Sequence, residues 1–377
     1  MSSFSSTYFD NASTSWPKPT EVSEAMTRFL QEAGGTYGRA AYKRVYETSM
    51  MVETCRNELA SLMGISDAGN IAFTANATQG LNTILFGLSL HDCEVLVSPL
   101  EHNAVMRPLE QLRTSRNVRW KVLPAMPDGK IRPEKIRGLI NEKTALVLIN
   151  HQSNVNGVIQ PIEKIRQHIG SLPLVMDVSQ SLGNIPVTPE EWGADFVAFT
   201  GHKGLLGPTG TGGFFARQTG LLAPLWVGGT GSRSESLEMP LFSPDKFEAG
   251  THNTVGLSGL LAALQHRPRQ LWEGQHLNGL IERLQNISGL SVLTADQPCD
   301  RGGLFSLVHQ TLKPSDMAQR LYHQYKIEVR SGLHCAPLAH KFFETFPTGT
   351  VRFSLSPFHT GEDLEKLGDI IEEILTE

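Results

Sequence analysis

The feature that most constrains the fold of this chain is a repeated succession of short apolar runs, polar turns and amphipathic stretches of helical length. The apolar runs predict strands, and a stretch such as 162–169 predicts one of the helices between them. This alternation is typical of an α/β fold, in which a mostly parallel sheet is covered by helices and binds ligands at the carboxyl ends of its strands. The predicted strands are residues 71–74, 94–98, 145–150, 173–177, 195–200 and 212–216.

The pattern changes after about residue 260, where single strands and helices no longer alternate. We expect a large domain of residues 16–260 and a smaller α+β domain formed by residues 1–15 together with 261–377. The chain of 377 residues is long enough for each domain to bury its own core. The elements predicted near and beyond the boundary are helices at 257–265 and 277–284, short strands near 303–309 and 351–355, and a closing helix from 362.

The composition argues against several classes of protein. Apolar residues make up 40% and charged residues 19% of the chain, as in ordinary globular proteins. The net charge is −5, from 33 basic and 38 acidic residues, and no run of Lys or Arg forms a nucleic-acid stripe. The polar N-terminus lacks the segments of a signal peptide, and no apolar run has the length of a membrane span. We expect a soluble, cytoplasmic protein with neither nucleic acid nor membrane as a partner.

The four cysteines lie far apart and form no CxxC pair, so the sequence predicts no zinc site, no redox dithiol and no bound metal. Cys55, Cys93 and Cys299 are expected to be buried as small hydrophobic residues. Cys335 differs because basic residues lie close to it in the sequence.

Polar residues that suit a bound ligand follow three of the predicted strands. Asp177 ends one strand, where a carboxylate either caps the next helix or faces a ligand charge, and capping is the commoner role. Another strand leads into FTGHKGLLGPTGTGG, in which His202 and Lys203 precede glycines that permit tight turns and close approach of a ligand. The segment FTANATQGL runs from a strand into a helix whose first turn suits an anion.

A lysine, a carboxylate and an anion-binding helix start are compatible with two kinds of cofactor site. A nucleotide phosphate loop is disfavoured, because the chain has neither GxxxxGK(S/T) nor a GxGxxG that joins a first strand to a helix. Pyridoxal phosphate fits better, since its aldehyde requires a lysine, its ring nitrogen a carboxylate and its phosphate hydrogen-bond donors. The alternative for Lys203 is a solvated loop lysine, the common role of this residue type.

Eight successive segments resemble the motifs of class V pyridoxal-phosphate enzymes, in the branch of the cysteine desulfurases and selenocysteine lyases. The similarity covers nearly the whole chain. It implies the fold-type I aminotransferase architecture, usually as a homodimer with active sites at the subunit interface. The segments are DNASTS, FTANATQGLN, SPLEHNAV, INHQSNVNGVIQPI, MDVSQSLGNIPV, FTGHKGLLGPTGTGGFF, FEAGTHNT and RSGLHCAP.

The resemblance implies a role for four residues around the cofactor ring. Lys203 would form the Schiff base and later move protons, and Asp177 would pair with the ring nitrogen. Gln180 would bind the ring hydroxyl. His102 would stack on the ring face, whereas the sequence alone equally allows a surface histidine.

The resemblance also implies which residues bind phosphate and substrate. Asn154 and Arg352 would receive the substrate carboxylate, and the chemistry agrees for Arg352 because a guanidinium matches a carboxylate with two parallel hydrogen bonds. The residues implied for the phosphate are Thr78, Thr200, His202 and, from the neighbouring subunit, Thr251.

The segment RSGLHCAP contains the most distinctive candidate, Cys335. Its neighbours His334 and Arg330 would favour the thiolate and lower the thiol pKa from its usual value of about 8.5. In the enzymes that the chain resembles, this cysteine attacks the sulfur of cofactor-bound cysteine, keeps it as a persulfide and releases alanine. The compact segment is similar to that of group II desulfurases.

Three positions depart from the pattern of that group. Leu333 stands where a second histidine is common, Thr200 replaces a frequent serine, and Tyr37 stands where a histidine is frequent. These differences leave the predicted cofactor site intact, but with them the resemblance no longer determines whether cysteine or selenocysteine is the preferred substrate.

We therefore expect a pyridoxal-phosphate-dependent cysteine desulfurase that acts on L-cysteine and passes sulfur to an acceptor protein. Three alternatives stay open at this point. They are a selenocysteine lyase, a class V aminotransferase or β-lyase in which Cys335 is incidental, and a non-catalytic scaffold that binds pyridoxal phosphate.

Overall fold

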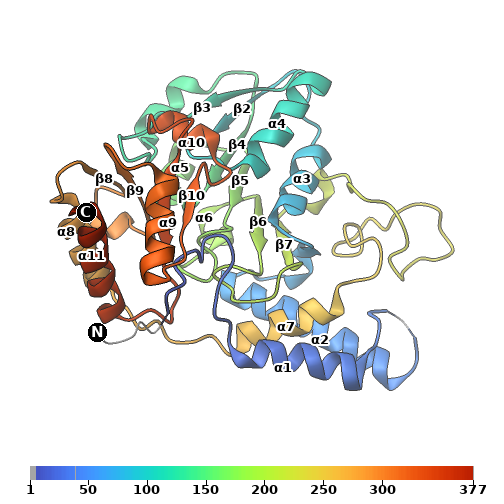
Figure 1. The fold of residues 1–377 in the computed structure, drawn as a ribbon. Coiled ribbons are helices and arrows are strands. Elements are labelled where there is room, and N and C mark those ends of the chain that lie inside the picture. The colour runs from blue at the N-terminus through green and yellow to red at the C-terminus, as the bar shows by residue number, and fades with distance from the viewer. Residues whose placement is uncertain (1–5, 39, 377) are drawn as a thin grey trace.

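The computed structural model describes residues 6–38 and 40–376 and contains two β-sheets with helices packed on them (Figure 1). The strands of the larger sheet are β1 (Ile71–Thr74), β2 (Glu94–Val97), β3 (Arg119–Val122), β4 (Thr144–Asn150), β5 (Leu174–Asp177), β6 (Phe196–Thr200) and β7 (Gly212–Ala216). Their order across the sheet is β1-β7-β6-β5-β4-β2-β3. The strands from β2 to β6 are parallel to their neighbours, and β7 is antiparallel to β1 and β6. The predicted α/β class is confirmed.

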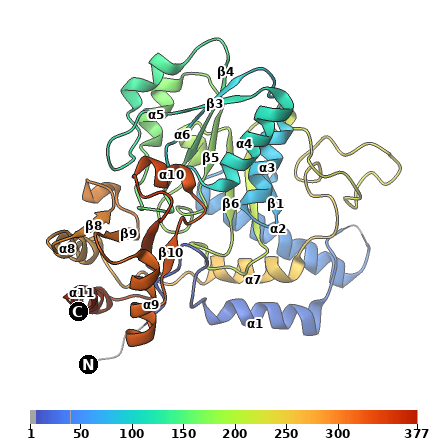
Figure 2. The same cartoon turned by 45° about the horizontal axis from the view of Figure 1, so that its top comes forward.

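Helices cover both faces of the larger sheet, as Figure 2 shows. One face is covered by α3 (Ala77–Gly87) and α4 (Asn103–Arg116). The other is covered by α2 (Lys43–Met63), α5 (Ile162–Ile169), α6 (Pro189–Trp192) and α7 (Thr254–Gln265). The N-terminal helix α1 (Thr20–Arg28) packs against α7.

Alternation along the strands divides the interior of the larger sheet into two cores. In β4, Leu146 and Leu148 pack into the cluster beneath α3 and α4, whereas Val147 and Ile149 pack into the cluster beneath α2, α5 and α7. All four side chains are fully buried. Each contributes about 1.5–3 kcal/mol relative to an exposed position, so the two cores fix the strand order and register.

The register of the central strands brings three chain segments together at one edge of the sheet. Asn150 at the end of β4 lies opposite Asp177 at the end of β5, and Asp177 lies opposite Ala198 in β6. The segments that follow these strands therefore emerge side by side, where the sequence predicts a ligand site.

The smaller sheet is antiparallel and has the strand order β10-β11-β9-β8, with β8 (Leu290–Leu293), β9 (Leu304–His309), β10 (Arg330–Gly332) and β11 (Thr350–Ser354). Its core is formed with α8 (Gly274–Gln285), α9 (Pro314–Tyr325) and α11 (Gly361–Thr376). The short α10 (Pro337–Phe342) follows β10. Shorter helical turns are η1 (Phe29–Ala33), η2 (Ala68–Asn70), η3 (Pro133–Leu139), η4 (Thr219–Leu221) and η5 (Pro298–Asp300).

The N-terminal segment joins the smaller sheet. Tyr8 and Asp10 form single bridges with Glu328 and Ser354, and Phe9 is buried in the same core. Parts of the chain more than three hundred residues apart thus lie together. The division into domains at residues 16 and 260 stays a prediction.

Two local predictions need correction. The edge strand β3, with the sequence Arg-Trp-Lys-Val, was not predicted, because it alternates charged and apolar residues and gives no apolar run; three of its four residues are exposed. No helix follows Asp177 directly: the chain forms turns before α6 begins. Within the described part of the chain, no helix combines the length and the apolar composition needed to cross a membrane.

Candidate active site

A cavity opens at the edge of the sheet where β4, β5 and β6 end. It is lined by residues from the start of α3, the start of α4 and the segments after the three strands. Those residues are Asn76, Ala77, Thr78, His102, Ala104, Asn150, Gln152, Asn154, Asp177, Ser179, Gln180, Thr200, His202 and Lys203. Most of the candidate residues from the sequence are therefore brought together. Cys335, Arg352 and Thr251 do not line this cavity.

Lys203 lies in the glycine-rich segment after β6, and two glycines there are required by packing. A Cβ on Gly201 would lie 2.2 Å from Thr211 Oγ1, and one on Gly204 would lie 2.5 Å from the carbonyl oxygen of Leu182. Neither glycine has a positive φ. The glycines thus let the segment fold tightly against neighbouring chain segments, which holds Lys203 at the cavity.

The electrostatic setting of Lys203 favours reactivity. The pKa of its ammonium is lowered to about 8: burial is the main cause, Asp177 opposes it, and the positive charges of Arg352 and Arg330 add to it. Among the described residues the ammonium has no hydrogen-bond or ion-pair partner. A lysine that is partly neutral near physiological pH is a competent nucleophile toward an aldehyde.

Asp177 at the end of β5 and Gln180 just after it line the same cavity as Lys203, which lies after β6. Asp177 is 7% exposed, and its Oδ1 accepts hydrogen bonds from the backbone N–H (2.9 Å) and the hydroxyl (2.5 Å) of Ser179. This carboxylate therefore stabilises a turn and caps no helix. Gln180 Nε2 donates to the carbonyl oxygen of Ala12 at 3.0 Å, which ties the N-terminal segment to the site.

His102 caps the N-terminus of α4: its Nδ1 accepts a hydrogen bond from the backbone N–H of Ala104 at 3.0 Å. Burial lowers the pKa of this imidazole to about 4, so the ring is neutral at physiological pH. Because Nδ1 is an acceptor, the ring proton is on Nε2. His102 thus lines the cavity as a neutral donor, and the alternative of a surface histidine is wrong.

One end of the cavity contains hydrogen-bond donors that suit an anion. Asn76 caps α3 by accepting from the backbone N–H of Gln79 at 3.0 Å, and the N–H groups of Ala77 and Thr78 lie in the first turn. His202 Nδ1 is buried and has no hydrogen-bond partner among the described residues. Burial lowers the pKa of His202 to about 4. Helix N–H groups, a threonine hydroxyl and an unpaired imidazole are the donors that a phosphate requires.

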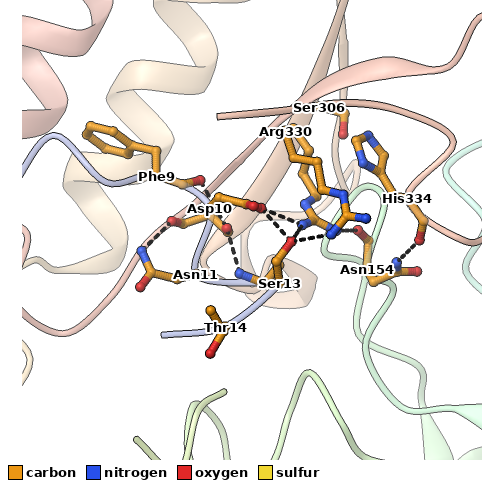
Figure 3. A network of polar contacts seen from close by, with 12 residues as sticks. Phe9, Asp10, Asn11, Ser13, Thr14, Asn154, Ser306, Arg330 and His334 are labelled. Atoms are coloured by element: carbon orange, nitrogen blue, oxygen red, sulfur yellow. Dashed lines mark hydrogen bonds and ion pairs between the residues drawn. The ribbon is translucent and has the colours of Figure 1, made fainter. Parts of the chain in front are cut away.

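Asn154 and Arg352 are in direct contact. Arg352, in β11, is 2% exposed, and its Nη1 donates to the carbonyl oxygen of Asn154 at 3.1 Å. Its Nη2 is 2.8 Å from both Asp10 Oδ1 and Ser13 Oγ, and its Nε has no partner among the described residues. Figure 3 shows the network of polar contacts to which Asp10, Ser13 and Asn154 belong. Burial lowers the pKa of Arg352.

Cys335 lies in a tight turn at the surface. His334 and Cys335 have φ values of 48° and 55°, and the backbone N–H of Ala336 donates to the carbonyl oxygen of Leu333 at 2.8 Å. The turn is fixed at two further points: Asn154 Nδ2 donates to the carbonyl oxygen of His334 at 2.7 Å, and the N–H of Asn103 donates to that of Cys335 at 2.8 Å. The exposed thiol residue is thus anchored beside the start of α4, next to His102.

The expected effect of His334 on Cys335 is wrong. The His334 ring is buried, its Nε2 lies 2.9 Å from Thr350 Oγ1, and burial lowers the pKa of the ring to about 2. A neutral, inward-facing imidazole supplies no positive charge to a surface thiol. Arg330 Nη1 donates to Ser13 Oγ at 2.7 Å.

The other cysteines differ in exposure. Cys55 is fully buried as predicted, Cys93 is partly buried, and Cys299 is exposed, so the prediction of burial is wrong for Cys299. Cys299 lies in η5, a polar turn, and no apolar pattern in the sequence supported its burial.

Thr251 and Tyr37 lie together, away from the cavity. Thr251 is exposed, three residues after the buried Glu248. Tyr37 packs its ring 4.7 Å from that of His252 and donates to Glu53 Oε1 at 2.8 Å. Within one chain Thr251 does not reach the cavity, and its predicted role across a subunit interface stays a prediction.

Sequence reasoning assigned no role to Asp10, Ser13, Asn150 or Gln152, although the first two belong to the segment DNASTS. Asn150 and Gln152 line the cavity: Asn150 ends β4 as Asp177 ends β5, and Gln152 lies two residues after Asn150. Polar residues directly after a predicted strand were the available signal for Asn150 and Gln152.

The fold and the site define a class of α/β protein with a lysine, a carboxylate and an anion cradle at one edge of a mostly parallel sheet. The family model for aminotransferase class-V matches residues 7–367, and the chain belongs to this family.

Two relatives named probable cysteine desulfurase are similar over nearly their whole length. The chain is 34% identical to a probable cysteine desulfurase of Methanothermobacter thermautotrophicus, over 97% of this chain and 94% of the relative. It is 32% identical to a probable cysteine desulfurase of Aeropyrum pernix, over 98% and 94%. The structure is similar to that of an apo cysteine desulfurase from Thermococcus onnurineus, with a TM-score of 0.89, 27% identity and coverage of 98% and 94%.

Proposed function

We propose that the protein is a pyridoxal-phosphate-dependent cysteine desulfurase that converts L-cysteine to L-alanine. The observation that carries the proposal is that Lys203, Asp177 and His102 line one cavity while Cys335 is exposed on a turn fixed beside His102. The relatives named cysteine desulfurase support the same reaction.

The polar side chains that line the cavity fit the groups of pyridoxal phosphate. Lys203 would hold its aldehyde carbon, Asp177 its ring nitrogen and Gln180 its ring hydroxyl. Thr78, Thr200, His202 and the start of α3 would hold the phosphate. When bound, pyridoxal phosphate acts as an electron sink that makes the bonds of the substrate labile.

Side chains of the protein orient the substrate, move its protons and accept its sulfur. Asn154 and Arg352 orient the substrate carboxylate, and Lys203 moves a proton at the substrate carbon. The Cys335 thiolate then bonds to the substrate sulfur as the carbon–sulfur bond breaks. The electron pair of that bond stays with carbon, which gains a proton to give alanine, and Cys335 keeps the sulfur as a persulfide. His102 would donate a proton from Nε2.

An exposed persulfide suits transfer to a second molecule. Cys335 lies on the surface, so a thiolate of an acceptor protein would reach it without opening the fold. We propose such an acceptor as the partner. The cytoplasmic location stays a prediction of the sequence.

The test compares the two exposed cysteines. Purified protein with pyridoxal phosphate should release alanine and sulfide from L-cysteine in equal amounts, faster with an added thiol. Cys335→Ala should lose sulfur transfer by about 100-fold or more while it keeps the visible absorbance of bound cofactor. Cys299→Ala, a matched control on another exposed turn, should retain wild-type activity.

Each alternative gives a different result. Activity with selenocysteine alone, independent of Cys335, would identify a selenocysteine lyase. Production of a keto acid, or dependence on an amino acceptor, would identify an aminotransferase or β-lyase. Cofactor binding without turnover of any thiol amino acid would leave a scaffold.

A further inference from the structure

Two arginines lie directly opposite each other in the smaller sheet. Arg330 in β10 pairs with Arg352 in β11. Like charges in opposite positions of an antiparallel pair destabilise a sheet, so this arrangement needs a compensating contact. A local rule broken in this way is often a mark of a functional site.

The compensating contact comes from the N-terminal segment (Figure 3). The Ser13 hydroxyl lies 2.7 Å from Arg330 Nη1, 2.8 Å from Arg352 Nη2 and 2.7 Å from Asp10 Oδ1. A guanidinium only donates, so the hydroxyl accepts from both arginines and gives its single proton to Asp10. All of its hydrogen-bonding capacity is thereby used in one orientation.

Asp10 supplies the only negative charge in this group. Its Oδ1 also forms an ion pair with Arg352 Nη2 at 2.8 Å, and its side chain is 20% exposed. Two guanidinium groups and one carboxylate leave one unit of positive charge. Arg352 Nε, which is buried and has no partner among the described residues, is a donor not used by this group.

The same segment contacts the cofactor side of the site. The N–H of Ser15 donates to the carbonyl oxygen of His202 at 2.9 Å, directly before Lys203. The Ala12 carbonyl accepts from Gln180. The segment DNASTS therefore connects the two arginines to the residues that line the cavity.

We propose that Asp10 and Ser13 are positioning residues that hold Arg330 and Arg352 together as one receptor for the single carboxylate of the substrate. Asp10 is the resident counter-ion and Ser13 the hydrogen-bonded bridge. The unit of positive charge that remains matches a monocarboxylate amino acid. This assignment rests on the proposed function for the identity of that amino acid.

The first experiment removes the bridge without changing charge. Ser13→Ala should raise KM for L-cysteine by about tenfold with kcat changed less than twofold, since a lost hydrogen bond to charged groups weakens binding by this order. Ser13→Thr, which keeps the hydroxyl, should restore KM. Ser23→Ala, whose hydroxyl lies on the exposed side of α1, is the control. Equal KM values for Ser13→Ala and wild type would overturn the assignment.

The second experiment tests the counter-ion. Asp10→Asn leaves both guanidinium groups without a resident anion, so inorganic sulfate should inhibit this variant competitively at about tenfold lower concentration than wild type. Unchanged sulfate inhibition would overturn the role of Asp10.

A binding measurement separates this inference from the proposed reaction. Calorimetric titration with propionate, a carboxylate that cannot react, should show weaker binding to Ser13→Ala than to wild type and Ser13→Thr. If wild type makes no alanine from L-cysteine but this difference is found, the receptor stands and the proposed function fails. If alanine forms and propionate binds equally to all three proteins, the receptor fails and the function stands.

Discussion

At the scale of single residues, the buried ammonium of Lys203 lowers the stability of the fold. Burial lowers the pKa of its ammonium to about 8, against about 10.4 in an unfolded chain. Between these two values the unfolded chain binds more protons than the folded one, so the stability of the cofactor-free protein should rise with pH across this interval. Below pH 8 the destabilisation by Lys203 is fully present, and above about pH 10.5 it is gone.

Lys203→Met should therefore stabilise the cofactor-free protein at pH 7, by about 2–3 kcal/mol, and the gain should vanish as pH rises through that interval. Urea unfolding of both proteins from pH 7 to 10.5 measures the difference, with the exposed Lys135→Met as control. A constant difference across this range, or a destabilised variant at pH 7, would contradict the assigned cause.

The sequence predicted which residues meet at one edge of the sheet where a single segment contained the signal, and their roles stay a prediction. Asp177 and Lys203 were found because each follows an apolar strand, and the register of β5 and β6 brings their segments together. Asp10 and Ser13 were missed because their partner Arg352 lies about 340 positions away. Local patterns do not show such pairing, and the neutral state of His334 depends on burial that its neighbours in sequence do not reveal.

At the scale of elements, a buried ion pair joins α2 to the segment that precedes α7. Arg56 in α2 is fully buried, and its Nη1 and Nη2 lie 2.7 and 3.1 Å from the two carboxylate oxygens of Glu248. Glu248 also accepts from the backbone N–H of Phe73 in β1 at 2.6 Å. The pair thereby fixes the segment that carries Thr251.

Arg56→Met should destabilise the protein by about 3–5 kcal/mol, because Glu248 stays buried without the guanidinium and, among the described residues, keeps only its contacts with His252 and the backbone N–H of Phe73. The double variant Arg56→Met with Glu248→Met should recover much of that loss, since no unpaired charge remains. Thermal or urea unfolding of the wild type, both single variants and the double variant measures the coupling. Additive losses in the double variant would show that the pair does not act as a unit.

At the scale of the whole molecule, the mostly parallel direction of the strands follows from the βα alternation, which the sequence shows directly, whereas their order across the sheet was not predicted. The return of the N-terminal segment to the smaller sheet does not follow from this pattern, because it depends on single bridges between distant residues.

A long segment between β7 and α7 carries many exposed apolar side chains. Residues 217–253 include a loop that extends away from the body of the chain in both views (Figures 1 and 2), whereas Leu222, Phe247 and Glu248 of the same range are buried. They carry the exposed apolar side chains Leu221, Leu225, Trp226, Val227, Leu237, Leu241 and Phe242.

An apolar segment of this kind is expected to be covered by a second subunit, and we predict a homodimer in which Thr251 binds phosphate in the partner's cavity. Sedimentation equilibrium should show a dimer, and Val227→Asp with Leu237→Asp should shift it to monomer. The monomer should bind pyridoxal phosphate at least about tenfold more weakly, because the cavity loses a phosphate donor. Tyr322→Asp, an exposed site on α9, should remain dimeric. A wild-type monomer with full cofactor affinity would rule out a role for Thr251 across the interface, since within one chain this residue does not line the cavity.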